Sequence, residues 1–323
     1  MTRFTTSSIL PTTMIALAVL AGLSNTLIAQ TYPSRSVRFV VPFAAGGPSD
    51  VAARIVGEAL SIRLGQSIVI ENRPGGDGLV AAQAVQSASA DGYTLLFSGS
   101  TIVPLSVLKD PRPFDVTTDF APVSQITRLE WAMYVSPHVP ASSIAEFIAY
   151  GRGNPDKLSY ASNNLVEDSA AVQLMKATGI KMVRVPYKGA GQAVADLVAG
   201  RVQVNFAPVS AYPRDGQLRM LAVLMPGRSR FAPDVPSLAE AGVSDVSVPG
   251  WQAILAPAKT PREIIGRLNS EINQALNTVK VRAQFERQNV QVQGSTAEAL
   301  AVTIKEELRA WSEFIRKYGI ALQ

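Results

Sequence analysis

Two segments of the chain share one order of apolar runs, glycine-containing loops and helical periodicity. The first starts with the apolar, β-branched residues 37–43, a pattern typical of a buried strand. The loop at residues 44–50 carries glycine and proline and cannot continue that strand. Apolar positions then recur at helical spacing over residues 51–64, Gly65 ends the helix, and residues 67–70 predict another strand. Strand, helix and strand in this order form the building unit of a parallel sheet.

The second segment repeats this order far along the chain. Residues 182–187 predict a strand, residues 188–192 form a loop with two glycines, and residues 193–199 predict a helix closed by Gly200. A further strand is predicted at residues 202–206. Both strands end in Val-Pro-aromatic, and both helices start after glycines. Two such units predict two lobes of related build.

Two further predicted strands end in polar residues. Residues 93–97 run into the hydroxyl-rich residues 98–101, and residues 157–161 run into residues 162–164. We expect both to be the carboxyl ends of parallel strands, where open α/β sheets bind their ligands. Ordinary turn chemistry explains such clusters equally well.

The rest of the pattern predicts how the lobes are connected. Apolar, strand-like segments at residues 123–135 and 250–257 are candidate crossings between the lobes. After Pro261 apolar residues recur at helical spacing, which predicts helix to the end of the chain.

The N-terminus has a composition of its own. Arg3 is the only charged residue before Arg35, and residues 9–23 are mostly apolar. This apolar core is shorter than the ~20 residues that a membrane-spanning helix needs. A positive start, a short apolar core and small residues up to Ala29 predict a cleavable secretory signal peptide.

Together these patterns predict an α/β protein of two lobes. We expect residues 1–29 to be the signal peptide, residues 30–127 with 254–323 to form the first lobe, and residues 128–253 to form the second. A length of 323 residues suits two domains of ordinary size. An apolar content of 47% with 17% charged residues suits a packed core.

Composition also excludes several functions. The chain has no cysteine, so disulfides, thiolate metal sites and cysteine nucleophiles are excluded. His138 is the single histidine and lies in a proline-flanked turn, so we expect no metal site and no histidine-based triad. The glycine loops match no dinucleotide, triphosphate or hydrolase motif, which argues against an enzyme. Basic residues are scattered, which argues against nucleic-acid binding. No cofactor is expected.

The chemistry of the two glycine loops points to an anion. The first N–H groups of a helix lack intrahelical partners, and the helix dipole places about half a positive charge there. Glycines let a ligand approach these groups closely, and Ser49 adds a hydroxyl. For Asp50, bonding within its own loop is the favoured alternative to ligand contact. For Lys188 the alternative is a solvated surface lysine.

The candidate ligand-binding residues come from the two loops and the two strand ends. They are Phe43, Ala44, Ala45, Gly46, Gly47, Ser49, Asp50, Ser98, Ser100, Thr101, Ser162, Asn163, Lys188, Gly189, Ala190 and Gly191.

Several ordered motifs resemble one known family. They lie at residues 41–50, 71–78, 90–96, 185–189, 234–242 and 251–261. Together they resemble the Bug family, the periplasmic solute-binding proteins of tripartite tricarboxylate transporters, over residues 32–323. The resemblance implies a type II periplasmic binding protein fold, with each lobe a mostly parallel sheet flanked by helices and strand crossings between the lobes. It also implies a monomer that binds a small carboxylate by lobe closure and passes it to inner-membrane permease subunits. A sensor that presents the solute to a membrane signalling protein is the alternative.

The chain departs from the family pattern in two places. Residues 163–168 replace a glycine-bearing turn, and the loop at residues 102–115 is reduced. Both lie where the distal end of the solute is expected. Glu167 or Asp168 would favour a solute with a distal amine, which stays a hypothesis here.

Overall fold

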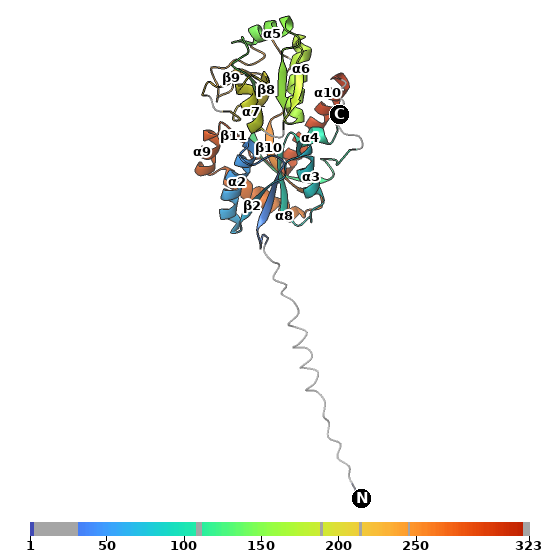
Figure 1. The fold of residues 1–323 in the computed structure, drawn as a ribbon. Helices are drawn as coiled ribbons and strands as arrows, with labels where there is room; N and C mark the ends of the chain where they lie inside the picture. The colour runs from blue at the N-terminus through green and yellow to red at the C-terminus, as the bar shows by residue number, and fades with distance from the viewer. Residues whose placement is uncertain (3–31, 108–111, 188–189, 213–214, 245, 319–323) are drawn as a thin grey trace. The chain divides into compact units, whose positions relative to one another are not determined.

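The computed structural model describes residues 1–2, 32–107, 112–187, 190–212, 215–244 and 246–318 (Figure 1). Contacts divide the chain into two compact units, residues 1–34 and residues 35–323. Except for Met1 and Thr2, the expected signal peptide lies outside the described residues. Within the described ranges, no helix has both the length and the apolar character needed to cross a membrane.

The first sheet combines strands from both ends of the larger unit (Figure 1). Its strands, in the spatial order β11-β4-β10-β3-β1-β2, are β1 (Val37–Val41), β2 (Ile68–Asn72), β3 (Thr94–Gly99), β4 (Phe120–Arg128), β10 (Trp251–Pro257) and β11 (Gln291–Val292). β1 pairs in parallel with β2 and β3, whereas β10 is antiparallel to β3 and β4.

The second sheet has the same division into a parallel and an antiparallel part. Its strands, in the order β7-β6-β8-β5-β9, are β5 (Trp131–Val135), β6 (Ser159–Ser162), β7 (Val183–Pro186), β8 (Val204–Pro208) and β9 (Arg219–Val223). β6 pairs in parallel with β7 and β8, and β5 is antiparallel to β8 and β9.

These two sheets confirm the expected two-lobed α/β fold, but neither sheet is mostly parallel. Parallel neighbours need a crossover that usually contains a helix. The strand–helix–strand units predicted from the glycine loops supply such crossovers. α2 joins the neighbours β1 and β2, and α7 joins β7 to β8, which lie on either side of β6. β5 and β10 instead come directly from the opposite sheet, so no crossover helix forces them to be parallel.

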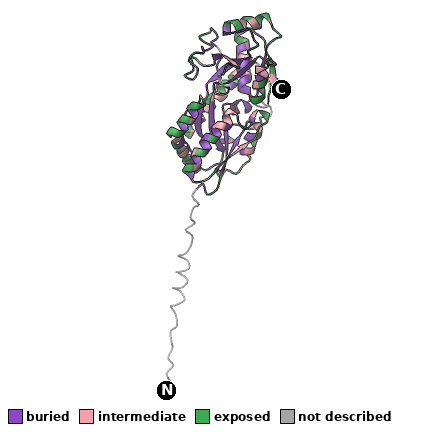
Figure 2. Cartoon of the chain, turned by 60° about the vertical axis from the view of Figure 1, so that its left-hand side comes forward, coloured by how far each residue is buried: buried purple, intermediate pink, exposed green. Residues whose placement is uncertain are grey.

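Helices cover the sheets. They are α2 (Pro48–Leu64), η1 (Gly76–Gly78), α3 (Leu79–Gln86), α4 (Ile102–Leu105), α5 (Ile144–Gly153), α6 (Leu165–Thr178), α7 (Ala190–Val198), α8 (Arg262–Leu276), α9 (Val279–Arg287) and α10 (Ala297–Tyr318). α2 packs against β1, β2 and α8, and α6 packs against β6 and β8. Buried positions gather on the strands and on the helix faces turned toward them (Figure 2).

The periodicity predicted helix from Pro261 to the end of the chain, but a short strand interrupts the helices. After α9, Gln291 and Val292 form β11, which pairs with Arg128 and Thr127 at the edge of β4. A two-residue strand has no periodicity of its own. The pairing depends on the edge of β4, a strand distant in the sequence, so the residues around Gln291 could not predict it.

The chain passes between the two sheets at two places. β4 ends at Arg128 and β5 starts at Trp131, while the chain returns to the first sheet where β10 starts at Trp251. The N–H of Leu129 donates to the carbonyl of Gly250 at 2.8 Å, so the two crossings are hydrogen-bonded to each other. β10 thus starts three residues before the boundary expected at 253/254, and the division into lobes by residue number stays a prediction.

β3 and β10 approach each other more closely than any side chain would allow. A Cβ on Gly99 would lie 2.2 Å from the carbonyl oxygen of Trp251. Gly99 faces Gln252 in the register of the two strands. The missing side chain therefore allows the strands to meet where the chain re-enters the first sheet.

We expect Gly99→Ala to reduce the free energy of unfolding by about 2 kcal/mol, the scale of an overpacked core position. Urea denaturation measures this loss. Gly266→Ala is the matched control, because Gly266 lies within α8 and its added Cβ would meet no atom within 4 Å. This control should leave stability unchanged or raise it by up to about 1 kcal/mol. Equal effects of the two substitutions would contradict the close approach.

Candidate functional site

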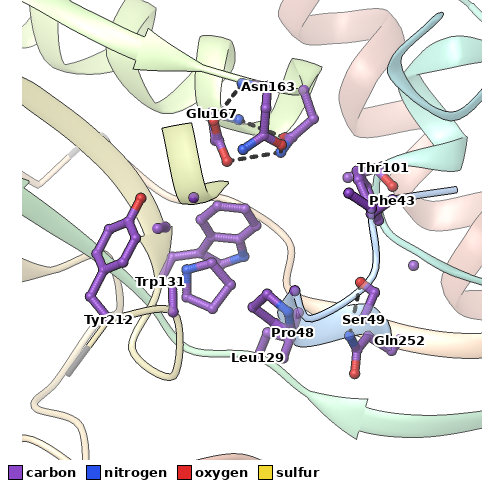
Figure 3. Close-up of a pocket in the computed structure, with 18 of the residues that line it drawn as sticks. Phe43, Pro48, Ser49, Thr101, Leu129, Trp131, Asn163, Glu167, Tyr212 and Gln252 are labelled. Atoms are coloured by element: carbon purple, nitrogen blue, oxygen red, sulfur yellow. Dashed lines mark hydrogen bonds between the residues drawn. The ribbon is translucent and has the colours of Figure 1, made fainter. Parts of the chain in front are cut away.

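A cavity of about 540 Å³ is lined by residues of both sheets and their loops (Figure 3). This volume is in the range of small-molecule sites. Ten of the predicted residues line it: Phe43, Ala44, Ala45, Gly46, Gly47, Ser49, Ser100, Thr101, Asn163 and Gly191. The structure therefore brings together parts of both glycine loops and of both strand ends.

One wall of the cavity is the start of α2. Gly47 is the N-cap in an extended conformation, and Pro48 occupies the first turn. Among the described residues, no side chain caps this end of the helix. Pro48 suits this place because its missing N–H would have no intrahelical partner. The hydroxyl of Ser49 accepts a hydrogen bond from the side-chain amide of Gln252 at 3.2 Å (Figure 3). The helix thus presents an uncapped N-terminus and a positioned hydroxyl.

Asp50 was predicted to contact the ligand, but it does not line the cavity. It is buried, with only 2% of its surface exposed, and its carboxylate accepts from the N–H of Gly46 at 2.9 Å. Arg54 binds both carboxylate oxygens, at 2.9 and 3.0 Å, and Asn72 donates to one of them at 3.0 Å. Burial raises the pKa of Asp50, but these hydrogen bonds and the charge of Arg54 outweigh it and hold the pKa below its usual value. Asp50 therefore stabilises the loop at residues 44–49 through Gly46.

The strand ends contribute less than predicted. Ser98 and Ser162 are buried inside β3 and β6 and do not line the cavity. Ser98 is paired with Ala253 in the sheet, and the hydroxyl of Ser162 donates to the carbonyl of Asn164. From these two strand ends the cavity is lined instead by Gly99, Ser100 and Thr101 and by Asn163 and Asn164, which lie at or beyond the last residue of each strand.

The second glycine loop is described only in part. Lys188 and Gly189 lie outside the described residues, as does the side chain of Ala190. α7 starts at Ala190, and Gly191 lines the cavity together with Gln192.

The main residues that the sequence reasoning missed are aromatic. Trp131 and Trp251 start the two strands that follow the crossings, and Tyr212 lies in the loop after β8; all three line the cavity. The hydroxyl of Tyr212 donates to the side-chain carbonyl of Asn205 on β8. A signal existed for the tryptophans, since both lie in segments predicted to cross between lobes. Nothing in the sequence near Tyr212 indicated a site.

Glu167 brings a carboxyl group to the cavity. It lies in the first turn of α6, where Asn164 is the N-cap and accepts from the N–H groups of Val166 and Glu167. The Glu167 carboxylate accepts from the N–H of Asn163 at 2.8 Å and from the side-chain amide of Asn164 at 2.9 Å (Figure 3). Only 3% of Glu167 is exposed. Its burial raises the pKa to about 8, although the hydrogen bonds from Asn163 and Asn164 favour the ionised form.

Residues 52–320 match one protein family, described as the tripartite tricarboxylate transporter family receptor. The chain belongs to this receptor family. The resemblance seen in the sequence motifs is therefore confirmed, and the family and the fold are those of solute-binding proteins.

Relatives of this receptor span almost its whole length. Protein BugT of Bordetella pertussis is 34% identical over 313 residues, which are 94% of this chain and 95% of BugT. An R. palustris protein solved with adipate has a TM-score of 0.85 and 31% identity, with 90% of this chain and 99% of that one covered. MatC from Rhodopseudomonas palustris, solved with bound malate, has a TM-score of 0.83 and 29% identity, with 88% and 100% covered.

We expect Asp50→Asn to lower the stability of the receptor by about 2 kcal/mol, because the amide nitrogen that replaces one carboxylate oxygen cannot accept from Arg54 and Asn72. The folded pKa of Asp50 is depressed, so its stabilising effect is complete above the unfolded pKa of about 3.9 and is lost as the pH falls through the folded pKa. Urea denaturation at pH 7 and below pH 3 measures both effects. A difference between the two proteins that persists in acid would contradict this role.

Proposed function

We propose that the chain captures a small carboxylate-containing solute in the periplasm, by closure of its two lobes, for the permease of a tripartite tricarboxylate-type transporter. One observation carries this proposal: the uncapped start of α2 forms a wall of the cavity. Family membership supports the link to a transporter.

The start of α2 suits an anion because its first N–H groups and the helix dipole offer positive charge in one direction. The negative charge of Asp50 does not cancel this, because Arg54 forms a bidentate ion pair with it. Each charge-assisted hydrogen bond to a carboxylate contributes roughly 1.5–3 kcal/mol. Two or three such bonds from the loop at residues 44–49 are enough for a carboxylate to bind without a lysine or arginine.

Three further observations support the cellular role. Relatives of the same fold were solved with adipate and with malate, both of which are carboxylates. The hydrogen-bonded crossings at Leu129 and Gly250 form the kind of connection about which two lobes hinge. The composition of residues 1–29 is that of an export signal.

A thermal-shift screen of mono- and dicarboxylates, amino acids and aromatic acids tests the proposal. At least one carboxylate should raise the melting temperature, because a ligand that binds only the folded state stabilises it. The methyl ester of that compound should lose the effect, since it cannot accept charge-assisted hydrogen bonds from the loop. The tryptophan fluorescence of Trp131 and Trp251 gives a second readout of the same cavity. An ester that stabilises the protein as well as its acid would refute carboxylate recognition.

Ser49→Ala should weaken binding of the solute found in that screen by about 1–2 kcal/mol, the contribution of one hydrogen bond to a charged group. Isothermal titration calorimetry measures the change. Ser61→Ala is the control on the same helix, because the Ser61 hydroxyl accepts from the N–H of Ile68 and does not line the cavity. It should leave affinity unchanged. If Ser49→Ala behaves like the control, Ser49 only helps to hold Gln252.

A further inference from the structure

Two helices of the second sheet start with the same local motif. α5 has Ser143 as its N-cap, and Glu146 reaches back to the N–H of Ser142 at 2.7 Å. α6 has Asn164 as its N-cap, and Glu167 reaches back to the N–H of Asn163 at 2.8 Å. Both are variants of the capping box, in which a glutamate in the first turn bonds a backbone donor ahead of the helix.

The two glutamates differ in their surroundings. Glu146 is exposed to solvent, whereas Glu167 is buried and lines the cavity. Capping alone does not require this burial, since Glu146 does the same work in water. Burial of a carboxylate is costly unless the charge is paired. The position of Glu167 therefore calls for an explanation beyond the helix start.

The groups packed around Glu167 do not supply a counter-charge. Its described hydrogen-bond donors are the N–H of Asn163 and the side-chain amides of Asn164 and Asn205, all of which are neutral. The neighbouring Asp168 is paired with Arg184 of β7 at 2.7 Å, and its negative charge opposes the ionisation of Glu167. β6 contributes Tyr160, the loop after β8 contributes Tyr212, and α4 contributes no titratable side chain.

The cavity itself holds no cation among its described lining residues. A carboxylate has about four acceptor positions, so Glu167 can still accept one more hydrogen bond beyond those from its three neutral donors. Trp131 and Tyr212 lie on the same side of the cavity (Figure 3). Aromatic faces attract cations and cover methylene groups.

We propose that the solute carries a cationic amine as well as a carboxylate, with the amine docked on Glu167 and the carboxylate at the start of α2. This inference rests on the proposed carboxylate binding and names the class of solute within it. A solute with a second carboxylate at this place would be repelled by the ionised form of Glu167 and could bind only while Glu167 is protonated.

The two classes of solute respond to pH in opposite directions. Burial raises the pKa of Glu167 to about 8, so the empty site binds a proton at pH 7. A cationic amine favours the ionised carboxylate, so its binding releases that proton and should strengthen up to tenfold per pH unit from pH 6 toward 8, then level off. An alkyl amine keeps its charge over this range, since its pKa is near 10.4. A dicarboxylate needs the protonated carboxyl group of Glu167, so its affinity should stay nearly constant up to about pH 8 and fall above it.

Matched pairs of probes test this inference on the exported chain. Each pair joins a carboxylate to either an amine or a second carboxylate through the same number of methylenes: β-alanine and succinate, 4-aminobutanoate and glutarate, 5-aminopentanoate and adipate, 6-aminohexanoate and pimelate. Calorimetry at pH 6, 7, 8 and 9 gives the affinities. At least one amino acid should bind ten times more tightly than its paired diacid at pH 8.

Glu167→Gln should reduce this preference at least tenfold and abolish its pH dependence. Glutamine can still accept from the N–H of Asn163, so the helix start is kept. Glu146→Gln makes the same chemical change at the exposed helix start of α5 and should alter neither result. Thermal unfolding of both variants shows that each is folded.

The outcomes separate the two proposals. If diacids bind in every pair more tightly than amino acids, or if Glu167→Gln leaves the preference unchanged, the amine is refuted and carboxylate binding stands. If no member of any pair binds and the wider carboxylate screen is also negative, carboxylate binding fails and the amine with it.

Discussion

The hydrogen bond between Leu129 and Gly250 is the constraint on which the rest of the structure depends. It holds the two backbone crossings side by side, and a Cβ on Gly250 would lie 2.2 Å from the carbonyl oxygen of Leu129. Trp131 and Trp251 follow these crossings directly and line the cavity. The connection between the sheets and the aromatic lining of the cavity are therefore one local arrangement, and a displacement of either crossing would move a tryptophan.

The C-terminal helix α10 also holds one of these tryptophans, Trp251. The indole N–H of Trp251 donates to the carboxyl group of Glu307 on α10, and burial raises the pKa of Glu307 to about 8. A protonated carboxyl group can accept this bond without a buried charge. A helix some 50 residues along the chain thus fixes the orientation of a cavity tryptophan. At the other wall, Asp50 fixes the loop before α2 through Gly46, so both walls depend on carboxyl groups that do not themselves line the cavity.

The mixed sheets and the partly correct site predictions have a common cause: patterns local in the chain can be predicted, whereas pairing between distant segments cannot. The parallel units around β1 and β6 were predictable, because strand, glycine loop and helix follow one another in the chain and each leaves a local pattern. The strands β10 and β11 join the first sheet from more than 100 residues away, and a two-residue strand has no period at all. Ser98 and Ser162 were expected at the cavity because polar strand ends often bind ligands, yet both remain inside their strands.

The sequence by itself determined the two glycine-loop helix starts, the α/β class and the family motifs, because each depends on residues close together in the chain. It placed Ser49 and Gly47 at the site for the same reason, since a helix N-terminus is a local structure. Only the tertiary structure decided that Asp50 faces inward, that Tyr212 joins the site, and that Glu167 is buried in the cavity while Glu146 is exposed. The two glutamates share one local motif, and what distinguishes them is burial, which depends on packing between segments distant in sequence.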